Sequence, residues 1–263
     1  MDREIAYAKI NLALHVRRRR DDGYHDLETL FAFCADGDVL EAEAADELSL
    51  KIDGPFARDL SATDNLVLGA AEMLGQGRGA AIRLTKNLPV ASGIGGGSAD
   101  AAATLRLLSR VWGIERDLHV IAAQLGADVP ACIRSTTSRG EGRGDALTVS
   151  ETDVSGTPLL VVNPSISLST ACVFKAWDGV DRGALSDWRI GRNDLDSPAQ
   201  LLVPAIGDLI EWLSGRAGVT TARMSGSGAT CFALFADRAD CKEAVEAAAR
   251  EFPNYWVMQS VLR

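Results

Sequence analysis

A short glycine-rich segment that runs into an alanine-rich stretch constrains the fold of this chain most strongly. Residues 89–105 have the sequence PVASGIGGGSADAAATL, in which four of the five positions 93–97 are glycine and Ser98 follows. Glycine lets backbone N–H groups turn inward and approach a ligand closely. A helix that opens at Ser98 adds unpaired N–H groups and the positive end of its dipole. The segment is therefore suited to binding an anion.

The two common nucleotide-binding motifs do not describe this segment. The sequence contains no GxxxxGK(S/T), and Gly93, Gly95 and Ser98 do not complete a GxGxxG. A flexible linker is the alternative, but linkers seldom lead directly into a well-formed helix. We therefore predict a phosphate-binding loop of a different type.

Composition indicates a soluble globular protein. The 263 residues are 47% hydrophobic and 24% charged, enough for one large domain or two ordinary ones with a substantial core. The net charge of −9 argues against a general nucleic-acid or membrane-surface binder, because such surfaces require a basic face. No segment has the unbroken apolar length of a membrane helix, and the N-terminus does not resemble a signal peptide.

Cysteine usage predicts a reduced, cytoplasmic protein. The cysteines are odd in number and form no CxxC pair, which argues against a disulfide framework or a zinc site. They are expected in the core, at Cys34, Cys132, Cys172, Cys231 and Cys241. No metal-ligand spacing links them to the histidines, His15, His25 and His119.

The one dense basic run, residues 17–20, is followed at once by Asp21 and Asp22. A solvated loop explains these arginines best, and a contact with a substrate phosphate is the alternative.

Hydrophobic periodicity predicts alternating strands and helices. Residues 9–16 alternate as a half-buried strand, with Lys9 and Asn11 on the face opposite the apolar residues. Further strands are predicted around 30–33, 39–44, 81–86, 159–162, 221–224, 230–235 and 255–262. Helices are predicted at 66–74 with Asp64 as its cap, after Ser98, at 117–125 ending at Gly126, at 206–213 and at 239–251.

The order of these elements indicates an α+β protein. A looser stretch at 135–157 is the expected domain junction. The β–β–α–β order of the last segments predicts antiparallel pairing with helices on one face.

Two charged residues are candidates for chemistry. Asp128 follows a helix stop in the segment 126–130, GADVP, whose apolar residues would partly desolvate it. An ordinary N-cap for a short helix at Val129 is an equally good local explanation. Lys9 is a single charge in a weakly polar strand, and a lysine snorkelling to solvent is the alternative.

Six motifs in a fixed order give the chain a resemblance to the GHMP kinase superfamily. They are the glycine loop and the segments 8–12 (AKINL), 22–25 (DGYH), 64–67 (DNLV), 126–130 (GADVP) and 224–229 (MSGSGA). The resemblance implies a two-domain α+β fold, each domain a mainly antiparallel sheet packed with helices, with the active site in the cleft between domains. It implies an N-terminal domain at 1–150 and a C-terminal domain at 151–263, the latter a ferredoxin-like α/β sandwich.

The combination of segments 8–12 and 22–25 is similar to one branch of this superfamily. That resemblance implies an enzyme that uses ATP, with Mg²⁺, to phosphorylate the 2-hydroxyl of a cytidyl diphosphate sugar alcohol on the non-mevalonate route to isoprenoid precursors. It implies a cytoplasmic monomer or weak homodimer with no nucleic-acid or membrane partner. The alternatives are another GHMP kinase, acting on mevalonate, homoserine or a sugar, and a non-catalytic nucleotide-binding protein.

The resemblance also implies roles for individual residues. Asp128 takes the hydroxyl proton, and Lys9 holds it ionised and polarises the nucleophile. The implied ATP-binding residues are Pro89, Val90, Ala91, Ser92, Gly93, Ile94, Gly95, Gly96, Gly97, Ser98 and Ala99. The implied substrate-binding residues are Asn11, Tyr24, His25, Thr170, Phe174, Gly226, Ser227 and Gly228.

Three of these roles have simpler explanations. Without the resemblance, a core aromatic beside a turn is the better explanation of Tyr24. A tight hairpin alone would also explain Gly226–Gly228. Ser98 contacts phosphate or Mg²⁺ in the implied site, and a helix-capping role is compatible with this.

Overall fold

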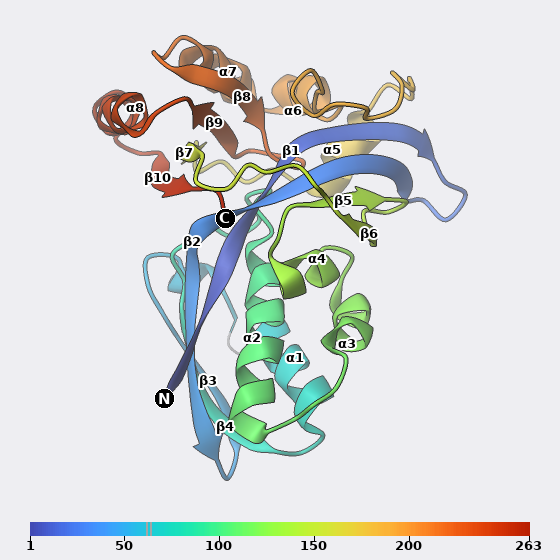
Figure 1. Ribbon diagram of the computed structural model, residues 1–263, viewed down its shortest axis with the longest axis vertical. Helices are drawn as coiled ribbons and strands as arrows, with labels where there is room; N and C mark the ends of the chain where they lie inside the picture. The colour runs from blue at the N-terminus through green and yellow to red at the C-terminus, as the bar shows by residue number, and fades with distance from the viewer. Residues whose placement is uncertain (62, 64) are drawn as a thin grey trace. The chain divides into compact units, whose positions relative to one another are not determined.

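Two compact units make up the protein, and each is assembled from separated stretches of the chain (Figure 1). The computed structural model describes residues 1–61, 63 and 65–263. Unit 1 comprises Met1–Lys9, Asp36–Val90 and Gly95–Ser135, and unit 2 comprises Ile10–Ala35, Ala91–Ile94 and Thr136–Arg263. Because the units interleave along the chain, they do not test the predicted domain boundary between residues 150 and 151, which stays a prediction.

The elements confirm a mixture of strands and helices. The strands are β1 (Asp2–Arg19), β2 (His25–Ala45), β3 (Leu48–Asp53), β4 (Gly79–Thr85), β5 (Ser138–Glu141), β6 (Ala146–Val149), β7 (Pro158–Asn163), β8 (Val219–Met224), β9 (Cys231–Phe235) and β10 (Trp256–Val261). The helices are η1 (Ala57–Asp59), α1 (Leu66–Gly75), α2 (Gly96–Trp112), α3 (Leu118–Leu125), α4 (Val129–Arg134), α5 (Thr170–Ala176), α6 (Asp196–Leu202), α7 (Ala205–Ser214) and α8 (Arg238–Glu251).

β1 is buried on both faces, so the prediction of a half-buried strand was wrong. Lys9, Asn11 and His15 lie on the face that was expected to be polar and exposed, and all three are buried. Each has a polar partner distant in sequence: Asp128, Thr29 and the backbone carbonyl of Gly183. Alternation identifies the strand, but it carries no information about such partners.

The arginine run at 17–20 is not a solvated loop. Its first three residues end β1, and three of its four arginines pair with acidic side chains. Arg17 pairs with Glu28, and Arg20 pairs with Asp26. The strand ends at Arg19, so only Arg20 of the run lies in the connection to β2, whose turn contains Gly23 at φ 84°.

β2 is one strand of 21 residues rather than the two separate runs predicted at 30–33 and 39–44. Its later part pairs antiparallel with β4 in unit 1, where β3 lies parallel to β4. Its earlier part pairs antiparallel with β5 in unit 2. Gly37 does not break the strand. A Cβ there would lie 1.9 Å from the Ala6 carbonyl oxygen, so glycine allows β1 and β2 to approach closely.

The helices of unit 1 pack together, with α2 against α1, α3 and α4 (Figure 1). α2 begins at Gly96, not at Ser98, because Gly95 takes the left-handed N-cap position at φ 68°. α3 is confirmed, with Asp117 as its cap and Gly126 at its end. The predicted cap Asp64 lies outside the described residues, and Asn65 caps α1 by accepting a hydrogen bond from the Val67 N–H.

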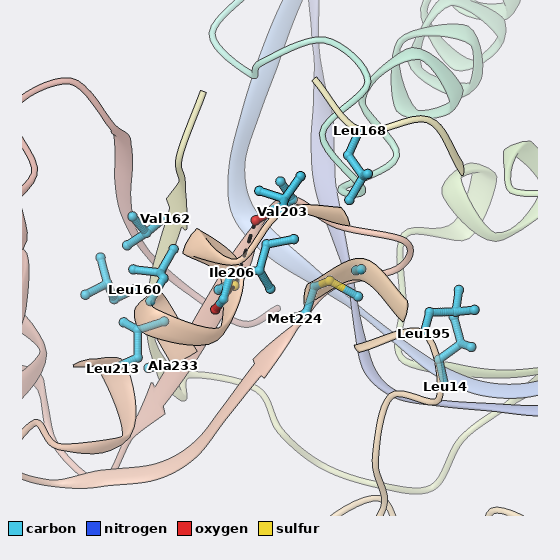
Figure 2. Close-up of a cluster of buried hydrophobic side chains, with 14 of the residues drawn as sticks. Leu14, Leu160, Val162, Leu168, Leu195, Val203, Ile206, Leu213, Met224 and Ala233 are labelled. Atoms are coloured by element: carbon cyan, nitrogen blue, oxygen red, sulfur yellow. Dashed lines mark hydrogen bonds between the residues drawn. The ribbon is translucent and has the colours of Figure 1, made fainter. Parts of the chain in front are cut away.

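Unit 2 contains an antiparallel sheet in the order β10–β7–β9–β8, which confirms the pairing predicted for the C-terminal segments. One face of this sheet carries α7 and α8 and forms the core shown in Figure 2. Leu160 and Val162 of β7 lie there beside Ala233 of β9, and Leu213 reaches them from α7. The predicted loose stretch at 135–157 holds the β5–β6 hairpin, whose short strands lack a hydrophobic alternation.

None of the five cysteines, all of which lie among the described residues, forms a disulfide. Cys172 is exposed on α5, so its predicted core position was wrong, and the other four are buried. Within the described chain, no helix is both long enough and apolar enough to cross a membrane.

Candidate active site

Unit 1 brings together the two residues predicted to carry the chemistry. Lys9 Nζ of β1 donates to Asp128 Oδ2 at 3.0 Å. The Lys9 side chain is 4% exposed, whereas that of Asp128 is 38% exposed. The ammonium group is therefore fixed on the carboxylate and not in solvent, and the carboxylate remains accessible to a further ligand.

Asp128 has the position of a helix cap but not the hydrogen bond of one. It is the N-cap residue of α4, but its side chain makes no capping hydrogen bond. Its carboxylate is directed to Lys9 instead.

The end of the glycine loop lies over the aliphatic part of Lys9. A Cβ added at Gly95 would lie 3.1 Å from Lys9 Cε, so only glycine leaves this space. α2 begins at the next residue and has no side-chain cap. Its first N–H groups are thus available to an acceptor, and the helix dipole favours an anion there. Ser98 lies half-buried in this first turn.

The predicted ATP-binding residues are divided between the units. Pro89 and Val90 belong to unit 1, as do Gly95–Ala99, whereas residues 91–94 belong to unit 2.

Unit 2 packs its part of the glycine loop against the second predicted glycine turn. A Cβ added at Gly93 would lie 2.6 Å from the Ser225 carbonyl oxygen and 2.7 Å from that of Gly228. The Ser225 hydroxyl donates to the Gly93 carbonyl at 3.0 Å, and the Thr230 N–H donates to the Ser92 carbonyl at 3.3 Å. The two glycine segments thus form one backbone surface in this unit.

Asn11 is hydrogen-bonded to the second glycine turn, at Ser225. Its backbone N–H donates to Ser225 Oγ at 3.2 Å, and its amide Nδ2 donates to Thr29 Oγ1 at 2.7 Å. Sequence reasoning did not assign a role to Ser225, although the residue lies within the quoted motif at 224–229. Its buried hydroxyl joins β1, the first glycine segment and the second.

Two of the predicted substrate-binding residues, His25 and Phe174, are in direct contact. Their ring centroids lie 4.8 Å apart with the planes inclined by 35°. Trp177, which the sequence did not single out, meets the His25 ring edge-on at 5.6 Å. Burial lowers the pKa of His25, and the charge of Arg19 acts in the same direction, so the neutral imidazole is favoured.

Tyr24 and Thr170 lie in the same unit with different partners. The Tyr24 side chain is 57% exposed, so a core position is excluded. The Arg143 guanidinium lies 5.2 Å from its ring centroid. The Thr170 hydroxyl lies 2.8 Å from that of Ser227, which links α5 to the second glycine turn.

Comparison with known proteins shows the family of the chain. The family model for the GHMP kinases N terminal domain matches residues 65–136, and that for the GHMP kinases C terminal matches residues 174–254. A 4-diphosphocytidyl-2-C-methyl-D-erythritol kinase of Rhizorhabdus wittichii is 54% identical over 277 residues, which cover 99% of this chain and 94% of the relative. The chain belongs to this kinase family.

Two further members of the family extend the match. The relative from Novosphingobium aromaticivorans is 52% identical and covers 99% of this chain and 93% of its own. A crystal structure of 4-(cytidine 5'-diphospho)-2C-methyl-D-erythritol kinase superposes with a TM-score of 0.82 at 32% identity, over 99% of both chains. The α+β GHMP kinase fold predicted from the motifs is thereby confirmed.

Proposed function

We propose that the chain transfers the γ-phosphoryl group of ATP to the 2-hydroxyl of 4-diphosphocytidyl-2-C-methyl-D-erythritol, giving the 2-phosphate and ADP. This step belongs to the non-mevalonate route to isoprenoid precursors. The observation that carries the proposal is the 54% identity, over 99% of the chain, with a relative named for this substrate. The Lys9–Asp128 pair supports a catalytic rather than a merely nucleotide-binding protein.

In the proposed reaction Asp128 accepts the proton of the attacking hydroxyl. Its carboxylate is partly exposed and already oriented by Lys9 at 3.0 Å. The Lys9 ammonium stabilises the negative charge that develops on the attacking oxygen. Positioning and charge stabilisation are the main contributions that a protein makes to phosphoryl transfer.

The loop at 89–99 is proposed to bind the ATP phosphates. The uncapped start of α2 supports this, because unpaired N–H groups there suit a phosphate oxygen. Mg²⁺ fits a site of this kind, since it is commonly held by few protein ligands together with substrate phosphates. Within the described residues no cluster of three His, Cys, Asp or Glu side chains forms a separate cage. The Ser98 hydroxyl is the proposed protein ligand, and the ion would neutralise phosphate charge.

Selectivity for the cytidyl group is assigned to the aromatic residues of unit 2. The exposed Tyr24 ring offers a stacking face, and the contact between His25 and Phe174 supports a shared base-binding role. The remaining proposed substrate contacts are Asn11, Thr170, Gly226, Ser227 and Gly228.

We further propose a cytoplasmic monomer or weak homodimer with no nucleic-acid or membrane partner. The lack of disulfides among the described cysteines supports a reducing compartment, and the net charge of −9 opposes binding to anionic polymers. Light scattering across a concentration series would measure the oligomeric state.

A coupled ADP-release assay tests the function. The cytidyl substrate should be turned over, and mevalonate and homoserine should not. Turnover of either alternative acceptor at a comparable kcat/KM would contradict the proposed substrate. If no acceptor is turned over while ADP still binds, the non-catalytic alternative would hold.

A further inference from the structure

A buried ion cluster in unit 1 has no part in the proposed reaction. Lys86, directly after β4, places its Nζ 2.6 Å from Asp38 Oδ2 and 2.6 Å from Asp100 Oδ2. The three side chains are 2%, 0% and 4% exposed, in the order Lys86, Asp38, Asp100. Stability alone is a weak reason for such a cluster, because well-packed apolar residues of the same volume are often as stable.

The cluster is hydrogen-bonded to the residues just before the glycine loop, Asn87 and Leu88, which we call the first flank of the loop. Asp38 Oδ1 accepts the backbone N–H groups of Asn87 and Leu88 at 2.6 and 2.8 Å. The Asn87 side chain adds a bond to the Gly37 carbonyl at 3.1 Å. The two residues before Pro89 are therefore fixed to β2.

The same cluster is bonded to the residues just after the loop, at the start of α2, which form its second flank. Asp100 lies in the second turn of α2, and a Cβ added at Gly96 would lie 3.1 Å from Lys86 Nζ. The ammonium group thus lies directly beneath the start of the helix. Lys86 joins the two flanks through one atom, although they are separated by the whole loop.

The cluster carries two carboxylates for one ammonium. Asp100 Oδ1 is buried and has no hydrogen-bond partner within the part of the chain that the structure describes. Burial raises the pKa of Asp100 to about 7; the charge of Asp38 adds to this effect, and Lys86 opposes it. An uncharged asparagine at this position is therefore a close substitute for the protonated acid.

We infer that Lys86 is a positioning residue for the nucleotide. By holding Asp38 and Asp100 together it sets the spacing of the loop flanks and the direction of the N–H groups at the start of α2. The inference rests on the proposed function, since it takes the loop at 89–99 to bind ATP.

The test compares Lys86→Met, Asp100→Asn and the double variant in the full-length protein. ADP affinity is measured by calorimetry, and KM is measured separately for ATP and for the cytidyl substrate. Lys86→Met should raise the Kd for ADP and the KM for ATP by about ten- to a hundredfold, since small misplacements of a binding group have effects of that size. The KM for the cytidyl substrate should change by less than about threefold, because the cluster touches only the loop flanks. Asp100→Asn keeps an oxygen acceptor for Lys86 Nζ, so it should change the Kd for ADP and the KM for ATP less than Lys86→Met does.

The double variant keeps the test available if Lys86→Met fails to fold. It leaves one buried carboxylate, Asp38, which retains its two backbone donors. Glu4→Gln is the matched control, because it removes partly buried ion pairs with Arg106 and Arg110 elsewhere in unit 1. It should lower the melting temperature without changing the KM for ATP.

Unchanged ADP affinity and KM for ATP in a folded variant that lacks Lys86 would overturn the inference. An equal rise of the KM for ATP in Glu4→Gln would overturn it as well, because the effect would then be general destabilisation. Failure of the proposed function looks different: the wild type itself would not turn over the cytidyl substrate.

Discussion

At the scale of single residues, Asp128 has a capping position but a different bonding partner. A capping aspartate normally bonds the N–H groups of the first helical turn. Asp128 instead bonds a lysine 119 positions away, which removes the carboxylate from helix capping and leaves it oriented beside a buried cation. Such an arrangement costs the helix a cap, so it is better explained by chemistry than by stability.

Asp128→Asn should lower kcat by at least about a hundredfold, since a positioned general base contributes roughly that much or more. Calorimetry should give an ADP affinity within about twofold of the wild type, because the loop and not the carboxylate binds the nucleotide. A folded variant with near wild-type kcat would remove Asp128 from the role of base.

Lys9→Met should also reduce kcat strongly, because Lys9 and Asp128 act as one pair at 3.0 Å. The double variant should be little worse than either single variant, since residues that act as a unit are strongly non-additive. The measurement is a double-mutant cycle on kcat. Additive losses would show that Lys9 acts independently of Asp128.

The aromatic residues of unit 2 should affect substrate affinity more than turnover. Tyr24→Ala or His25→Ala should raise the KM for the cytidyl substrate by about five- to a hundredfold, because stacking on a base is worth roughly 1–3 kcal/mol. The KM for ATP should stay nearly constant. Tyr255→Ala is a suitable control, since it removes a ring stacked on Phe252 at 4.9 Å in the same unit. If Tyr24→Ala leaves the affinity for CDP unchanged, Tyr24 does not bind the base.

At the scale of elements, two glycine-to-alanine substitutions can distinguish the effect of packing between the two glycine segments from the effect of backbone strain. Gly93 and Gly156 have φ angles of +78° and +77°, but only Gly93 has backbone atoms where a Cβ would lie. Alanine at either position costs about 1–2 kcal/mol for the left-handed conformation. Gly93→Ala should in addition push the Ser225–Gly228 turn away and raise the KM for ATP by about tenfold or more.

Thermal melts and steady-state kinetics on both variants check this prediction. Gly156→Ala should lose a similar amount of stability to backbone strain and keep its KM for ATP. Equal KM values for ATP in the two variants would mean that contact between the glycine segments does not contribute to ATP binding.

Elements defined by local signals were predictable from the sequence, and those defined by distant partners were not. Asp117 and Gly126 mark the limits of α3 because a cap and a terminating glycine act within one turn. The continuity of β2 depends on pairing with β4 and β5, which lie far along the chain. The Lys86 cluster was missed for the same reason, since Asp38 is 48 positions away and no periodicity marks it.

At the scale of the whole molecule, the predicted active-site residues came from the order of motifs and not from any one of them. Lys9 alone suggested a snorkelling side chain, and Tyr24 alone a core aromatic. Six motifs in family order outweighed both, and the buried Lys9 and exposed Tyr24 agree with the motif-based interpretation. Hydrophobic periodicity predicted which segments are strands and which are helices. Only the family resemblance predicted that Lys9 and Asp128 act together.

The pH dependence of folding should reflect opposing groups in the two units. The pKa of Asp100 in unit 1 is raised from 3.8 to about 7 by burial, with Lys86 and Asp38 facing it. The folded state then holds a proton that the unfolded state has lost, so this contribution to stability falls as the pH rises between those values. His15 and His25 in unit 2 have pKa values lowered from 6.5, chiefly by burial. Their contribution is full above pH 6.5 and is lost as the pH falls below it.

Asp100→Asn removes only the first of these contributions. Its free energy of unfolding relative to the wild type should therefore increase steadily as the pH rises from about 5 to about 7 and then level off. Over that range folding of the wild type takes up a proton at Asp100, which becomes less favourable with rising pH, and the variant needs no such proton. Urea unfolding of both proteins at a series of pH values measures the difference, in which the histidine contributions cancel. A constant difference over this range, or one that decreases with rising pH, would show that Asp100 is already ionised in the folded protein at low pH. The cluster would then hold two full negative charges against Lys86, and asparagine would no longer be a close substitute for Asp100.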